Sequence, residues 1–161
     1  MIISKPTQEE FNEWLDISTN VQADDRAFTN DSNPETELMK LKQFIPMILP
    51  DGQNTSGHYF NILSTDEIHN IGFIWFGSFP GLDEETIILL DIMLKEQYRS
   101  CGYGRKLLKQ MQNVMREKGY KKIFLSVLKK NFALKLYESL GYKIINEKPK
   151  YQEMILDLTE L

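Results

Sequence analysis

The segment DIMLKEQYRSCGYG spans residues 91–104 and joins an aliphatic strand to a helix through a short turn. Apolar residues recur at helical spacing from Tyr103 to Lys118, so the helix begins within the glycine-rich part of the segment. Helix N-termini expose unpaired backbone N–H groups and a partial positive charge, so they bind anions. Gly102 and Gly104 let the backbone approach a phosphate, and the Arg99 guanidinium matches phosphate oxygens. The segment therefore predicts a phosphate-binding turn in an α/β protein.

Two familiar phosphate-binding motifs do not fit this turn. A dinucleotide-binding fingerprint would place a third glycine where this chain has Leu107. A P-loop requires Gly-Lys-Ser/Thr, whereas Gly104 is followed by Arg105 and Lys106. A plain strand-to-helix connection, in which the glycines only turn the chain, stays open as an alternative.

A second segment, NFALKLYESLGY at residues 131–142, lies one predicted strand downstream of the first. Together the two resemble the acetyl-CoA-binding core of the GNAT superfamily of N-acetyltransferases. Members of that superfamily carry an Arg/Gln-x-x-Gly-x-Gly/Ala turn, a strand, and a helix with Asn, Ala, Leu-Tyr and Leu-Gly-Phe/Tyr. The resemblance covers residues 86–147, and the N-terminal part is similar to an uncharacterised bacterial branch of the superfamily.

The resemblance implies an α/β (α+β) fold in a single domain, residues 1–161. A central mixed β-sheet would be flanked by helices, with acetyl-CoA wedged between two splayed strands. It also implies that the edge backbone of Met93 and Leu94 pairs with the pantetheine amides like an added strand. The residues implied to bind the cofactor are Met93, Leu94, Arg99, Ser100, Cys101, Gly102, Tyr103, Gly104, Arg105 and Asn131.

The implied reaction requires a base for the acceptor amine and an acid for the departing thiolate. An amine that attacks a thioester must first lose a proton, and a lysine-like amine has a pKa of about 10.4. Asp91 is the expected base, with Glu84 or Glu85 as alternatives and a purely structural carboxylate also open. Tyr137 matches the family's acid for the departing thiolate, and ordinary helix packing is its alternative. A backbone N–H near Leu94 would stabilise the negative carbonyl oxygen.

Two departures from the family pattern keep a second function open. Asn131 stands six residues before Tyr137, whereas typical members have seven, and Lys130 occupies the expected place. Many members also carry a second acidic residue where this chain has Met93. The rival function is a catalytically silent acyl-CoA-binding sensor or interaction module. The acceptor amine also stays open, because acceptor loops vary freely in such a fold.

Composition and residue counts bear on the number of domains, the cellular location and the expected partners. The 161 residues, 42% hydrophobic and 26% charged, suit one globular domain. One cysteine and an N-terminus without an apolar signal stretch predict a cytoplasmic protein. Two histidines at no ligand spacing predict no metal, and a net charge of −4 gives no reason to expect nucleic acid. Residues 1–80 hold 4 Lys/Arg against 12 Asp/Glu, which favours a cationic acceptor.

The expected partner is an amine of a small molecule, a peptide or a protein. We expect no association with a membrane, and a homodimer stays open. Periodicity and turn residues predict the elements in order. Strands are predicted at 1–4, 58–64, 71–79, 86–94, 123–128, 142–146 and 154–158, and helices at 7–21, 34–48, 103–118 and 131–140.

Overall fold

The computed structural model describes every residue from Met1 to Leu161. Seven strands form one mixed sheet in the order β1-β2-β3-β4-β5-β7-β6. The strands are β1 (Ile2–Ser4), β2 (His58–Ser64), β3 (Gly72–Gly77), β4 (Thr86–Leu94), β5 (Lys122–Leu128), β6 (Lys143–Glu147) and β7 (Tyr151–Asp157). The helices are α1 (Gln8–Asn30), α2 (Pro34–Ile48), α3 (Tyr103–Glu117) and α4 (Ala133–Ser139), with short 3₁₀ turns η1 (Gly52–Asn54), η2 (Glu96–Tyr98) and η3 (Leu158–Glu160). The predicted mixed α/β fold is confirmed, and no helix is both long enough and apolar enough to cross a membrane.

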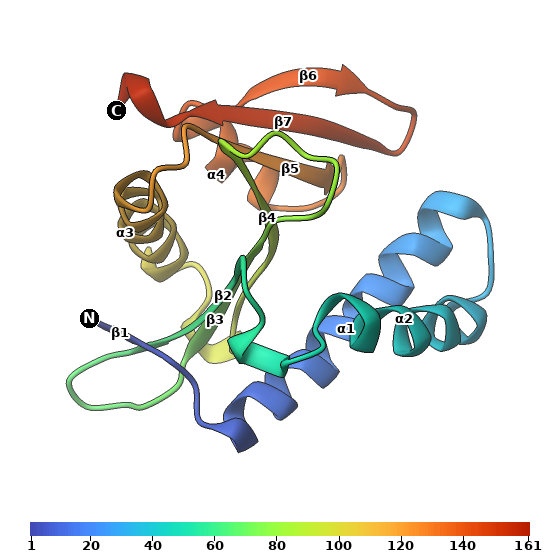
Figure 1. Cartoon of the computed structure of the whole chain (residues 1–161), viewed down its shortest axis with the longest axis horizontal. Coiled ribbons are helices and arrows are strands. Elements are labelled where there is room, and N and C mark those ends of the chain that lie inside the picture. The colour runs from blue at the N-terminus through green and yellow to red at the C-terminus, as the bar shows by residue number, and fades with distance from the viewer.

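Helices cover both faces of the sheet, as Figure 1 shows with α3 on one side and α1 and α2 on the other. Each side has its own hydrophobic core. Leu107 and Met111 of α3 pack in one core with Phe76, whereas Trp14 of α1 packs in the other with Trp75. Side chains of successive β3 residues pack alternately into the two cores, so this strand is buried throughout. Burying each such side chain contributes about 1.5–3 kcal/mol to folding.

Helix α1 is nine residues longer than its predicted end at Val21. Its start follows the prediction, because the Thr7 hydroxyl accepts the Glu10 N–H at 3.2 Å in a capping box. Beyond Val21, the inner face continues through the buried small residues Ala23 and Ala27. Small and polar side chains carry little hydrophobic periodicity, which is why the pattern ended the helix too early.

Strand β3 ends at Gly77, two residues before its predicted end, and the starts of two other elements differ by two or three residues from their predicted positions. Helix α4 begins at Ala133 rather than at Asn131, because the Asn131 Oδ1 accepts the Ala133 N–H at 2.9 Å and caps the helix from outside. Strand β7 begins at Tyr151, three residues before its predicted start at Met154. These shifts leave the order of elements as predicted.

Strands β4 and β5 part after a short parallel pairing. They pair only from Thr86 opposite Lys122 to Ile88 opposite Phe124. Beyond this point β4 stays paired with β3 up to Leu94, while β5 stays paired with β7. The strand edges that face each other across the divergence are free to pair with another group. The splayed strands that the resemblance implied are therefore present.

A β-bulge in β4 lies within this divergent part. Trp75 of β3 is opposite Asp91 and Phe76 is opposite Leu89, so Leu90 is an extra residue. Leu89 packs in the core on the α3 side, and strict alternation would send the Asp91 side chain to that side as well. The bulge breaks the alternation, and Asp91 instead contacts Ser18 of α1.

Candidate active site

The predicted phosphate turn joins η2 to α3. Ser100 and Gly102 have left-handed backbone conformations, with φ of 60° and 85°. No side chain caps the start of α3, so its first N–H groups are available to an anion. Although nothing lies within 4 Å of a β-carbon placed on Gly102, its positive φ would strain any other residue there. The turn thus leaves backbone N–H groups of the helix start unpaired, and phosphate binding there stays a prediction.

Two arginines flank the turn. The Nε of Arg99 donates to the Leu94 carbonyl oxygen at 3.0 Å, which holds the guanidinium at the end of β4. The Nη1 of Arg105 donates to the Ser139 Oγ at 2.7 Å and links α3 to α4. A β-carbon on Gly104 would lie 3.7 Å from Leu94 Cδ1, so the glycine leaves space beside the end of β4. These features fit an extended phosphate-bearing group that runs from the turn into the splay.

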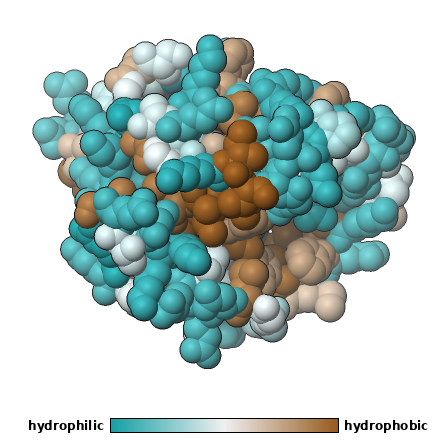
Figure 2. All heavy atoms as spheres, turned by 90° about the horizontal axis from the view of Figure 1, so that it is seen from above, coloured by the Kyte–Doolittle hydropathy of each residue, from teal (hydrophilic) through white to brown (hydrophobic).

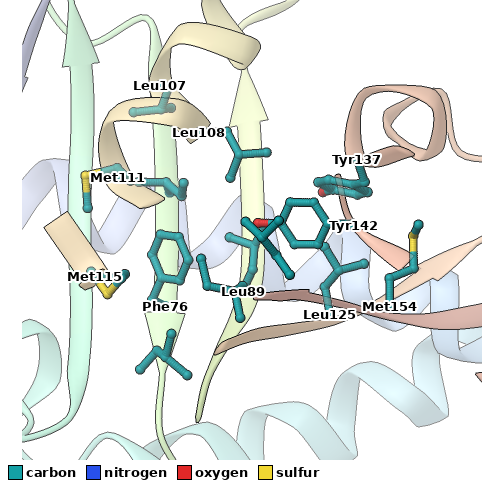
Figure 3. Close-up of a cluster of buried hydrophobic side chains, with 14 of the residues drawn as sticks. Phe76, Leu89, Leu107, Leu108, Met111, Met115, Leu125, Tyr137, Tyr142 and Met154 are labelled. Carbon is teal, nitrogen blue, oxygen red and sulfur yellow. The ribbon is translucent and has the colours of Figure 1, made fainter. Parts of the chain in front are cut away.

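Tyr137 of α4 lies in the core next to Tyr142, with ring centroids 5.5 Å apart (Figure 3). Burial raises the pKa of the Tyr137 phenol well above its ordinary value, and the negative charge of Asp91 raises it further. The phenol therefore keeps its proton at neutral pH and can act as a hydrogen-bond donor. Tyr137 is both a core residue and a candidate acid, so the two alternatives do not exclude each other.

The carboxyl group of Asp91 is surrounded by protein, although the residue keeps part of its surface open. Burial raises its pKa to about 6, against opposing hydrogen bonds from the Ser18 hydroxyl and the Ile92 N–H. The nearby charge of Asp25 on α1 raises this pKa further. A carboxylate with such a pKa is ionised at neutral pH and still basic enough to accept a proton.

The alternative bases lie at the wrong end of β4. Glu85 precedes the strand, and its Oε1 pairs with the Lys121 Nζ at 2.8 Å. That end is where β4 and β5 are paired, whereas the splay opens toward Leu94. Glu84 is adjacent to Glu85 and lies at the same end. The charge of Asp91 thus acts on Tyr137, whereas both glutamates lie at the opposite end of β4.

A cavity of about 410 Å³ opens on the α1 side of the splay. Its wall is mostly polar and includes Gln22 and Asp25 of α1, Leu90 of β4, Asn131, and Glu153 of β7. Asn131 lines this cavity and also caps α4, and its contact with pantetheine stays a prediction. A larger cavity of about 610 Å³ lies between β2 and α3 and touches none of the predicted site residues.

The sequence did not single out the α1 residues of this site. Ser18, Gln22 and Asp25 are spaced four and three residues apart, which places them on one helical face. Ser18 bonds to Asp91, and the other two line the cavity. The available signal was this polar spacing, but Gln22 and Asp25 lay beyond the predicted end of the helix.

The single cysteine and the two histidines are not among the candidate catalytic residues. Cys101 is an exposed free thiol within the phosphate turn. His58 Nδ1 accepts the Trp75 indole N–H at 3.1 Å, and His69 Nε2 lies 2.5 Å from a Glu10 carboxylate oxygen, both away from the turn. No three His, Cys, Asp or Glu side chains are grouped so as to hold a metal ion.

Known proteins share both the sequence pattern and the fold. Residues 14–142 match the Acetyltransferase (GNAT) family. The chain is 30% identical over 144 residues to the uncharacterised N-acetyltransferase YycN of Bacillus subtilis, covering 88% of this chain and 92% of that one. It is 28% identical over 116 residues to the [ribosomal protein bS18]-alanine N-acetyltransferase of Haemophilus influenzae, covering 71% of this chain and 77% of that one.

Solved structures agree with these matches. The crystal structure of YycN from Bacillus subtilis superimposes with a TM-score of 0.81 at 27% identity, covering 91% of this chain and 94% of that one. The PaiA N-acetyltransferase of Thermoplasma acidophilum, in complex with coenzyme A, shares the fold with a TM-score of 0.70 at 18% identity, covering 97% and 98% of the two chains. With the splayed strands and the glycine turn beside them, these matches make the chain a member of the GNAT family of acetyltransferases.

Proposed function

We propose that this protein is an acetyl-CoA-dependent N-acetyltransferase that acts on a primary amine of a small molecule, a peptide or a protein by direct attack. The observation that carries the proposal is the splay between β4 and β5, with the phosphate turn at its end and Asp91 and Tyr137 beside it. The coenzyme A complex of the PaiA relative supports the choice of acetyl donor.

The residues around the splay fit this donor, which supplies an acetyl group already activated as a thioester. The N-terminus of α3 and Gly102 would hold the pyrophosphate, and Arg99 would neutralise its charge. The free edge of β4 at Met93 and Leu94 would pair with the pantetheine amides. The other residues that we assign to cofactor binding are Ser100, Cys101, Tyr103, Gly104, Arg105 and Asn131.

Proton transfers in this reaction fall to two side chains. Asp91, ionised at neutral pH with a pKa of about 6, accepts the proton that the acceptor amine must lose. The amine nitrogen then bonds to the carbonyl carbon, and the carbon–sulfur bond breaks. Tyr137, which holds its phenolic proton until this step, gives that proton to the departing sulfur, so that coenzyme A leaves as the thiol and the phenol regains a proton from solvent. A backbone N–H near Leu94 remains our prediction for the developing oxyanion.

The acceptor would enter from the cavity beside α1. Asp25 and Glu153 contribute carboxylates to its wall, against the single guanidinium of Arg26. A polar wall with this excess of acid favours a hydrophilic amine that carries positive charge. An apolar acceptor would leave these carboxylates desolvated without a partner.

Association of two copies stays a prediction. β6 is an edge strand of the sheet, and its Ile144 and Ile145 are exposed. Figure 2 looks down on the end of the molecule where β6 lies and shows an apolar patch among hydrophilic residues.

Thiol release from acetyl-CoA, followed across a panel of amines, tests the proposal. We expect release that depends on one class of amine in the wild-type protein and no release in Gly102→Val. Glu85→Gln, altered at the far end of β4, is the matched control and should keep its activity. Coenzyme A binding without amine-dependent release across the panel would contradict the proposal and favour the silent acyl-CoA-binding module. A lack of coenzyme A binding would contradict both.

A further inference from the structure

We propose that Ser18 is the positioning residue for the catalytic base, with its hydroxyl oriented by Gln22 so that it always donates to Asp91. The inference rests on the proposed function and adds two residues of α1 to its machinery. Helix α1 crosses the sheet on the side away from α3, so these residues reach the site from the face opposite the phosphate turn (Figure 1).

The hydrogen bonds of Ser18 have only one consistent direction. Gln22 Nε2 donates to the Ser18 Oγ at 3.0 Å, which uses an acceptor lone pair of the hydroxyl. The single hydroxyl hydrogen is then left for the Asp91 Oδ2, an acceptor in the ionised state. Ser18 is fully buried, so losing this bond would leave its hydroxyl hydrogen desolvated and without an acceptor. The bond therefore holds the carboxylate in one orientation.

The hydroxyl of the neighbouring Thr19 makes the hydrogen bond that is usual within a helix, which Ser18 does not make. Thr19 is also buried, and its Oγ1 donates to the Leu15 carbonyl at 2.6 Å, one turn back on the same helix. This back-bond is the usual arrangement for a hydroxyl within a helix. Ser18 instead reaches across to β4, where the bulge turns Asp91 toward α1.

The chain of hydrogen bonds also connects the base to the acceptor side. Gln22 lines the cavity of about 410 Å³, so the chain runs from the cavity wall through Ser18 to Asp91. The other groups that act on Asp91 are the Ile92 N–H, which favours its ionised form, and Asp25, which opposes it. Tyr137 on α4 also lies within the reach of its charge. Ser18 is the side-chain hydrogen-bond donor in this set.

Removing the Ser18 hydroxyl should therefore change the pH profile of the reaction. Its hydrogen bond lowers the pKa of Asp91, so Ser18→Ala should keep the base protonated up to a higher pH. From the usual strength of a hydrogen bond to a charged group, the acidic limb of kcat/KM should move up by about 1 pH unit. Loss of orientation should also lower kcat above the limb by on the order of 10-fold.

The test compares four variants with the wild-type protein, using the best amine from the thiol-release panel. Ser18→Ala should show the shifted limb, and Gln22→Met, at a partly exposed position, should show a smaller shift in the same direction. Thr19→Ala removes a buried hydroxyl that does not touch Asp91, so its profile should match wild type. Coenzyme A affinity by calorimetry should be unchanged in all three, and Asp91→Asn should be inactive.

The outcomes separate this inference from the function on which it rests. An Asp91→Asn variant as active as wild type would remove Asp91 from the mechanism, and the inference would fall with it. An inactive Asp91→Asn beside a Ser18→Ala variant with wild-type kcat and acidic limb would overturn the positioning role alone. If Ser18→Ala does not fold, Gln22→Met decides, because an unmoved limb in a folded variant would also overturn that role.

Discussion

Replacing Asp91 with asparagine should stabilise the protein while removing its activity. The buried carboxyl group has a pKa of about 6, raised from an ordinary value of 3.8, mainly by burial. Burial therefore makes the ionised form costly in the folded state. Asparagine has nearly the same shape, carries no charge, and still offers an oxygen to the Ser18 hydroxyl.

The sign and size of the effect follow from the two pKa values. Below about pH 4 the carboxyl is protonated in both the folded and the unfolded states, so Asp91 carries no penalty. Between about pH 4 and 6 the unfolded state ionises first, and the folded wild-type protein loses stability as the pH rises. Above pH 6 the loss is complete. A shift of about 2 units corresponds to about 3 kcal/mol, which water at the open side of the residue reduces to about 2 kcal/mol.

The assay is urea unfolding of wild type and Asp91→Asn at pH 4.5 and pH 8. The variant should gain about 2 kcal/mol over wild type at pH 8, or about 4–8 °C in Tm for a chain of this size, and much less at pH 4.5. Asp66→Asn, at an exposed carboxylate in the β2–β3 connection, is the control and should show no such pH dependence. An equal difference at both pH values, or a less stable variant at pH 8, would refute the reasoning.

Three further predictions concern the donor side of the site. Gly102→Val should abolish coenzyme A binding in calorimetry with the circular dichroism unchanged, because valine does not tolerate a φ of 85°; wild-type affinity in a folded variant would remove the turn from the site. Saturating coenzyme A should slow alkylation of the exposed Cys101, as followed by mass spectrometry, and equal labelling rates would place the donor elsewhere. Tyr137→Phe should lower kcat by about 10- to 1000-fold while the acceptor KM stays within a few-fold; normal turnover when chemistry is rate-limiting would leave the phenol only a packing role.

The conformation of the turn that we assign to the donor was predictable because its determinants are local. The turn from Arg99 to Gly104 needs glycines for its backbone angles and a helix start for its free N–H groups, and both are features of neighbouring residues. Gly141 likewise ends α4 with a φ of 95° directly after the segment that carries Tyr137. Such signals survive in a single sequence without any knowledge of the tertiary fold.

The side that we propose for the acceptor was not predictable, because its contacts join residues far apart in the chain. Ser18 and Asp91 are separated by 73 positions, and nothing local to Asp91 in the sequence indicates that a serine within a distant helix binds its carboxylate. The residues from Gln22 to Asn30 lay beyond the predicted end of the helix at Val21, and five of them line a cavity. Polar side chains that face a cavity inside the protein have the same local pattern as those that face water.

The bulge at Leu90 shows how much of the mechanism depends on such non-local structure. A regular β4 would direct Asp91 to the same side as Leu89, into the apolar core beneath α3. Deeper burial among apolar side chains would raise the pKa of the carboxyl further and favour its protonated form. The extra residue instead brings Asp91 to Ser18, where its carboxyl group, with a pKa of about 6, is ionised at pH 7 as the proposed base must be. The implied reaction pointed to Asp91 as a candidate base, but the surroundings of its carboxyl group depend on the register between β3 and β4.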